Sequence, residues 1–136
     1  MWGQGQQGGN QGFGQLTKSP HFGGNGGAFN DFGQNPNLSL VAVRGGAGSL
    51  IDRVQFLFID INTGQYVESG AYGGQGGAPF QFQAPPGQWI TDIWVTHGAL
   101  VNRLRFGTNQ GVTSDTYGND DANHGHFHTN GRITGV

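Results

Sequence analysis

Apolar and polar residues alternate along several short stretches of this chain. From Arg53 to Asp60, for example, Val54, Phe56 and Phe58 occupy one face of an extended strand. The same period of two occurs at residues 38–44 and 80–83, and residues 89–97 and 103–108 are further predicted strands. Runs rich in glycine, proline or asparagine separate these stretches, at residues 45–48, 62–64 and 85–87. The pattern predicts an all-β protein of short antiparallel strands joined by tight turns.

Two segments recur 50 residues downstream, in the same order. Residues 48–56 (GSLIDRVQF) match residues 98–106 (GALVNRLRF), and residues 23–28 (GGNGGA) match residues 73–78 (GGQGGA). Such a period is typical of a duplicated supersecondary unit, here an antiparallel Greek-key sheet. A third unit is predicted to begin near Asn123. Because each sheet alone would expose an apolar face, we expect three sheets around a pseudo-threefold axis with a shared core.

The composition narrows the possible functions. The 136 residues suit one domain, with 34% hydrophobic and 10% charged residues. The net charge is −2 and the basic residues are scattered, which argues against a nucleic-acid partner. The absence of cysteine excludes a disulfide, a thiolate metal site and a cysteine nucleophile. No apolar run approaches the ~18 residues of a membrane span.

The first 20 residues differ from the rest. Residues 2–15 are nearly all glycine, glutamine and asparagine, with Trp2 and Phe13 as their large side chains. Such a segment buries too little surface to offset the entropy of ordering, so residues 1–20 are predicted to be a disordered tail and residues 21–136 the folded domain. A tail that docks through Trp2 or Phe13 is the alternative. The start of the chain also lacks the regions of a signal peptide. We expect a protein not secreted by that route, or a mature form with an added methionine.

Together the glycine loop, the Gly-x-x-x-Asp turn and the period near 50 resemble the jacalin-related lectins. The resemblance extends over residues 21–136. The segments that carry it are residues 23–29, 51–56, 72–77, 104–109 and 131–135. It implies a β-prism of three four-stranded sheets that binds sugars at one end.

The chain departs from the family pattern at its C-terminus. The family's most widely used sugar site lies on a Gly-x-x-x-Asp turn that would follow Val136, so the resemblance implies that this turn and its strand are missing. The loop at residues 23–27 would then lack its partner, and the third sheet would be incomplete. Either the chain is truncated, or another segment or subunit completes the sheet.

Asp52 is the strongest candidate for ligand binding. It ends the turn Gly48-Ser49-Leu50-Ile51-Asp52, where a glycine allows close approach of a ligand. An ionised carboxylate can accept hydrogen bonds from two neighbouring sugar hydroxyls, and the amides of Ser49 and Leu50 can face the same point. By resemblance, some mannose-binding members use this turn together with backbone N–H groups of the next glycine loop. That loop here is Gly73-Gly74-Gln75. The alternative is that Asp52 only caps the turn.

The second unit carries Asn102 where the first has Asp52. An amide lacks the charge, so we interpret Asn102 as structural.

The histidines at 124, 126 and 128 alternate and follow two acidic residues, Asp120 and Asp121. On one strand face the imidazoles could share a metal, and the carboxylates could add oxygen ligands for calcium. Neither spacing matches a known ligand set, so we interpret the segment as a polar strand face beside a solvated turn. We predict no metal and no cofactor.

Two tryptophans, Trp89 and Trp94, are five residues apart and are predicted to face opposite sides of a strand, one of them in the core. Glu68 has no carboxylate neighbour at a hydrolase-like spacing, and no serine lies in a nucleophile elbow. We therefore expect no enzymatic activity.

The predicted function is a lectin for mannose- or glucose-type glycans and glycoproteins. Single sugars bind weakly in shallow sites, so a homodimer is expected to supply avidity. This function favours a secreted or extracellular location. The rival hypothesis is a structural or self-assembling matrix-type protein that uses the tail, with the prism as scaffold. A weaker third hypothesis is a metal-dependent module built on the histidine strand.

Overall fold

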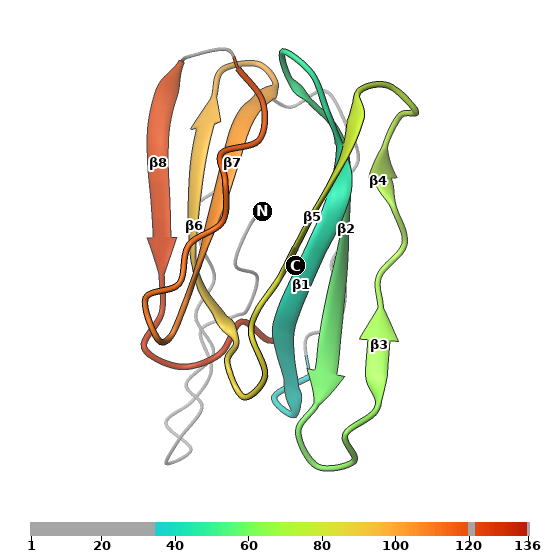
Figure 1. Ribbon diagram of the computed structural model, residues 1–136, viewed down its shortest axis with the longest axis vertical. Coiled ribbons are helices and arrows are strands. Elements are labelled where there is room, and N and C mark those ends of the chain that lie inside the picture. Colours follow the sequence, from blue (N-terminus) through green and yellow to red (C-terminus); the bar gives the residue numbers. More distant parts are fainter. Residues whose placement is uncertain (1–34, 120–121, 136) are drawn as a thin grey trace.

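A computed structural model describes residues 35–119 and 122–135 of the chain. Within these residues the structure consists of strands and turns, which confirms the all-β prediction. The strands form two antiparallel sheets that face each other (Figure 1). No helix of the length and apolarity needed to cross a membrane occurs in the described parts.

The first sheet is built from the first half of the domain. Its strands are β1 (Leu38–Ala47), β2 (Ile51–Asp60), β3 (Tyr66–Glu68), β4 (Tyr72–Gly73) and β5 (Ala78–Gln83). The spatial order is β3-β2-β1-β5. Strand β4 pairs with β2 on the same side as β3, at Arg53 and Val54. Because β5 returns to lie beside β1, the sheet is a Greek key.

The second sheet has the same plan. It contains β6 (Ile90–His97), β7 (Val101–Thr108) and β8 (Asn123–His128), in the order β7-β6-β8. Single bridges join Thr113 and Tyr117 to the outer side of β7. Residues 113–117 therefore occupy the place that β3 and β4 hold in the first sheet.

The assignment of the histidine segment to a third unit is wrong. The segment forms β8, which pairs with β6 along its whole length, from Asp92↔His128 to His97↔Asn123. It thus corresponds to β5. The hairpins keep the 50-residue offset, since β7 begins 50 residues after β2, but β8 begins only 45 residues after β5. The chain between Thr108 and Tyr117 is shorter than that between Asp60 and Tyr72, which hides the correspondence.

The core lies between the two sheets. Val54, Phe56 and Phe58 all face it, as their alternation predicts, and Phe58 is completely buried. From the second sheet Phe106 is completely buried and stacks against Phe82 with the ring centroids 6.4 Å apart. Each such side chain contributes about 1.5–3 kcal/mol through burial.

The prediction that one tryptophan belongs to the core is wrong. Both Trp89 and Trp94 are only partly buried. Trp89 lies just before β6, where its indole N–H donates to the Gly131 carbonyl and the Arg132 guanidinium lies 3.9 Å from its ring centroid. Trp94 lies on the outer face of the second sheet, because its neighbours Ile93 and Val95 point inward.

The predicted tail and the loop at residues 23–27 lie outside the described residues. The closing segment of the chain is described and packs beside β1. Leu40 N donates to the Ile133 carbonyl at 2.9 Å, and the Ile133 side chain is buried.

Candidate functional site

The turns that carry the candidate residues lie together at one end of the molecule, at the top of Figure 1. This end contains the β1–β2 turn, the β4–β5 loop and the β6–β7 turn. The two units are joined there, because Asn119 N donates to the Ser49 carbonyl at 3.1 Å. Segments distant in sequence thus form one surface.

The β1–β2 turn is short and tightly bonded. Gly48 N donates to the Leu50 carbonyl at 2.9 Å, and β1 shifts its register against β2 just before the turn. The equivalent bond in the second hairpin, from Gly98 N to the Leu100 carbonyl, is 3.0 Å long. Gly48 and Ser49 are exposed, and Asp52 follows as the second residue of β2.

The β4–β5 loop is held against the backbone of Asp52. Gly74 N donates to the Asp52 carbonyl at 2.8 Å. Gly73 adopts a φ of +116°, and a Cβ at this position would overlap the same carbonyl, so no other residue fits. The Arg53 guanidinium donates to the Gly74 carbonyl at 3.2 Å. The loop is therefore fixed by backbone contacts that require glycine.

The Asp52 carboxylate lies against the second part of this loop. A Cβ at Gly76 would be 3.2 Å from Asp52 Oδ1, and one at Gly77 would be 2.5 Å from Oδ2. No hydrogen bond to this carboxylate comes from any residue in the described parts of the chain. Its oxygens are thus placed by the loop and retain their capacity to accept hydrogen bonds from a ligand.

The structure brings the predicted site residues together at one end of the molecule. The amide of Gly74 is already bonded to Asp52, so it positions the loop and does not face a ligand. Gln75 is exposed at the loop tip. Gly76 and Gly77, which approach the carboxylate most closely, were not among the predicted residues. Their signal was present, because the glycine run continues to residue 77.

The second unit repeats the backbone contact without the charge. Gly118 has a φ of +89°, and a Cβ there would overlap the Asn102 carbonyl, just as at Gly73 and Asp52. The dipeptide Tyr117-Gly118 therefore corresponds to Tyr72-Gly73. Asn102 holds an amide where Asp52 holds a carboxylate.

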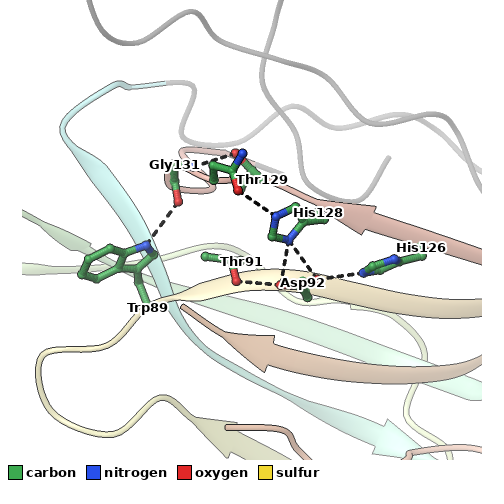
Figure 2. Close-up of polar contacts among 8 residues, drawn as sticks. Trp89, Thr91, Asp92, His126, His128, Thr129 and Gly131 are labelled. Atoms are coloured by element: carbon green, nitrogen blue, oxygen red, sulfur yellow. Dashed lines mark hydrogen bonds and ion pairs between the residues drawn. The ribbon is translucent and has the colours of Figure 1, made fainter. Parts of the chain in front are cut away.

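A second group of titratable side chains lies on the outer face of the second sheet (Figure 2). Asp92 Oδ2 is 2.8 Å from His126 Nε2, and Asp92 Oδ1 is 3.0 Å from His128 Nδ1. Burial would raise the pKa of Asp92, but hydrogen bonds from Thr91, His128 and His126 outweigh it and lower this pKa. The bond to Asp92, with a further bond to Asn130, raises the pKa of His128.

No group of three or more histidine or acidic side chains in the described segments is arranged to hold a metal ion. Asp120 and Asp121 lie outside those segments. Glu68, considered above for hydrolase chemistry, pairs with Arg44 at 2.8 Å on the exposed face of the first sheet.

Several known lectins are similar to this chain in sequence or structure. The sequence of residues 19–136 matches the jacalin-like lectin domain. Wild-type Malaysian banana lectin is 25% identical, with 84% of this chain and 81% of that chain covered and a TM-score of 0.67. A mannose-binding jacalin-related lectin from Ananas comosus is 24% identical, with 79% and 76% covered and a TM-score of 0.66. A mannose-binding lectin from champedak is 20% identical, with 84% and 81% covered and a TM-score of 0.69.

A comparison with curated protein sequences returns no match. The two antiparallel sheets match the jacalin β-prism structures, as expected from the resemblance. The domain match extends over far more than half of the chain. The protein therefore belongs to the jacalin-like lectins, a family of non-enzymatic carbohydrate-binding proteins.

Proposed function

We propose that this lectin binds mannose- or glucose-type glycans at the β1–β2 turn, with Asp52 as the principal acceptor. The observation that carries the proposal is the position of the Asp52 carboxylate. It lies against a glycine loop, at the end of the molecule where the turns meet, and accepts no hydrogen bond from the described residues.

The chemistry suits a pyranose with two adjacent hydroxyls that are both equatorial, or one equatorial and one axial. The carboxylate accepts from both hydroxyls, and each such charge-assisted bond contributes about 1.5–3 kcal/mol. The amides of Ser49 and Leu50, at the exposed turn, supply donors to the ring or hydroxyl oxygens. Gln75 closes the opposite side, while Gly73 and Gly74 hold the loop in place.

The sugar class is supported by similar structures. The lectins from Ananas comosus and champedak are both described as mannose-binding. Mannose and glucose both offer the neighbouring hydroxyls that a single carboxylate can bridge. The partners would be glycans or glycoproteins that carry these sugars.

The site is open, so a single sugar would be held weakly. Two linked sites increase the apparent affinity through the effective concentration of the second site. We propose a homodimer as the simplest arrangement that presents two Asp52 sites.

The test compares two alanine variants on immobilised mannose. Asp52→Ala removes two charge-assisted bonds and is expected to weaken binding at least a hundredfold. Asn102→Ala, the matched change at the equivalent turn, is expected to bind normally. Normal retention of Asp52→Ala would refute the site assignment.

A deletion of residues 1–20 tests the competing structural role. A lectin that uses the Asp52 turn keeps its sugar binding without the tail. A protein whose function is self-assembly through the tail loses its assembly while the domain stays folded.

A further inference from the structure

The outer face of the second sheet carries a regular array of side chains. Strands β7, β6 and β8 lie side by side, and the residues paired across them form three rows. The rows are Arg103–Thr96–His124, Arg105–Trp94–His126 and Gly107–Asp92–His128. Arginine thus lines one side of the central strand and histidine lines the other.

The middle row is organised by Trp94. The His126 ring stacks on the indole, with the centroids 4.8 Å apart and the planes at 6°. From the opposite neighbouring strand, the Arg105 guanidinium lies 5.1 Å from the ring centroid. The edge of the indole rests on Gly107, where a Cβ would be 3.0 Å from it. Trp94 therefore holds one permanent cation and one titratable imidazole in fixed positions.

Beside this row the surface is hollowed. A hollow of about 390 Å³ lies on the sheet, with polar side chains around it. Its polar lining comprises Thr96, Arg103, Arg105, Thr116, His124 and His126. None of the described residues that line it has a carboxylate, so its charged groups are hydrogen-bond donors.

Among the described residues, two aspartates lie beside residues that line the hollow. Asp92 lies one row away and contacts both His126 and His128 (Figure 2). Asp115, on the segment beside β7, acts on Tyr117, whose ring packs against Phe80 and Phe106. Among the described residues Arg105 forms no ion pair, and it is exposed.

The corresponding face of the first sheet provides a contrast. It also has a hollow, of about 460 Å³, with Arg44 and Arg53 in its lining. There, however, Arg44 donates to Glu68 and to Gln55, both at 2.8 Å, and Arg53 donates to a backbone carbonyl. The cations of that face are satisfied within the protein.

We infer that the hollow on the second sheet is a binding site for an acidic sugar, distinct from the Asp52 site. Arg105 and His126 bind the oxyanion, a sulfate ester or a uronate carboxylate, and the threonine hydroxyls contact the neighbouring sugar oxygens. Arginine suits this role because its fork donates two parallel hydrogen bonds to one oxyanion. The volume lies in the ~300–1,000 Å³ range of small-ligand sites, which is larger than an inorganic anion needs and sufficient for a sugar unit.

The experiment uses three columns with one polysaccharide backbone: dextran, dextran sulfate and carboxymethyl dextran. All proteins carry Asp52→Ala in the full chain, so that the proposed neutral-sugar site does not contribute. Retention is measured as the salt concentration that elutes the protein. We expect retention on one or both anionic columns and none on neutral dextran. The two anionic columns distinguish a sulfate from a carboxylate ligand.

Variants locate the binding to the hollow. Arg105→Gln and His126→Gln should each weaken the apparent affinity about tenfold, the loss of one charge-assisted hydrogen bond. Arg44→Gln removes the same charge from the other sheet and should elute like the parent. Equal retention of the parent, Arg105→Gln and His126→Gln overturns the inference. A loss in Arg44→Gln as large as that in Arg105→Gln also overturns it, because it would show that retention depends on net charge alone. Because the parent lacks Asp52, a failure here leaves the mannose proposal unaffected.

Discussion

The glycine at position 77 offers a direct test of how the loop places the Asp52 carboxylate. Its φ is +81°, and a Cβ there would be 2.5 Å from both Asp52 Oδ2 and Ala47 N. The carboxylate can rotate away, but the backbone nitrogen of Ala47 belongs to the sheet and cannot. In Gly77→Ala the loop must therefore move by about 1 Å to restore ordinary contact distances.

A matched variant separates the two costs of this change. Gly64 has nearly the same φ, +76°, but a Cβ there would meet nothing within 4 Å. Gly64→Ala therefore carries only the cost of a left-handed conformation, about 1–2 kcal/mol. Gly77→Ala adds the overlap, another ~1–3 kcal/mol by analogy with overpacked sites. It also shifts the loop away from Asp52.

Both variants are compared by urea unfolding and by retention on immobilised mannose. We expect Gly64→Ala to lose some stability and to keep its sugar binding. Gly77→Ala should unfold at a lower urea concentration than Gly64→Ala and bind mannose at least tenfold more weakly. If Gly77→Ala matched Gly64→Ala in both measurements, the account of the loop as the support of the carboxylate would be refuted.

Two further predictions concern the second sheet. The raised pKa of His128 stabilises the fold below the ordinary histidine pKa, and this stabilisation is lost as the pH rises through the pKa of the folded state. The lowered pKa of Asp92 stabilises the fold above the ordinary aspartate pKa, and this stabilisation is lost in stronger acid. His128→Gln should therefore lower the urea midpoint at about pH 5 and leave it unchanged at about pH 9, and an equal effect at both pH values would contradict the role of the ion pair. Phe106→Ala removes a fully buried ring that stacks against Phe82, so we expect a loss of about 3–5 kcal/mol in the free energy of unfolding. A loss below ~1 kcal/mol would show that the core is not packed as described.

The site itself could be predicted only in part. The turn and the following glycine loop were expected to converge on Asp52, and the backbone bond from Gly74 shows that they do. The bond from the Gly74 amide to the Asp52 carbonyl could not be predicted, because the sequence does not show which amides donate within the protein. The glycine run marks residues 76 and 77 as part of the loop, but the distance of Gly77 from the carboxylate depends on how the loop crosses β1.

The sequence by itself determined the longer strands, the inward face of β2 and the two hairpins. These are local properties, since a period of two decides which side chains face the core and glycine decides where the chain can turn. Val54, Phe56 and Phe58 are buried as their alternation requires.

Only the tertiary structure decided which strands are partners. The histidine strand alternates equally well in any sheet, but packing placed it beside β6, and this pairing brought His126 against Trp94 and Asp92. Pairing across a sheet depends on the length of the connections and on the fit of the shared core, which no local pattern contains. For this reason the Asp52 turn could be recognised along the chain, whereas the cationic hollow on the second sheet could be found only in the folded protein.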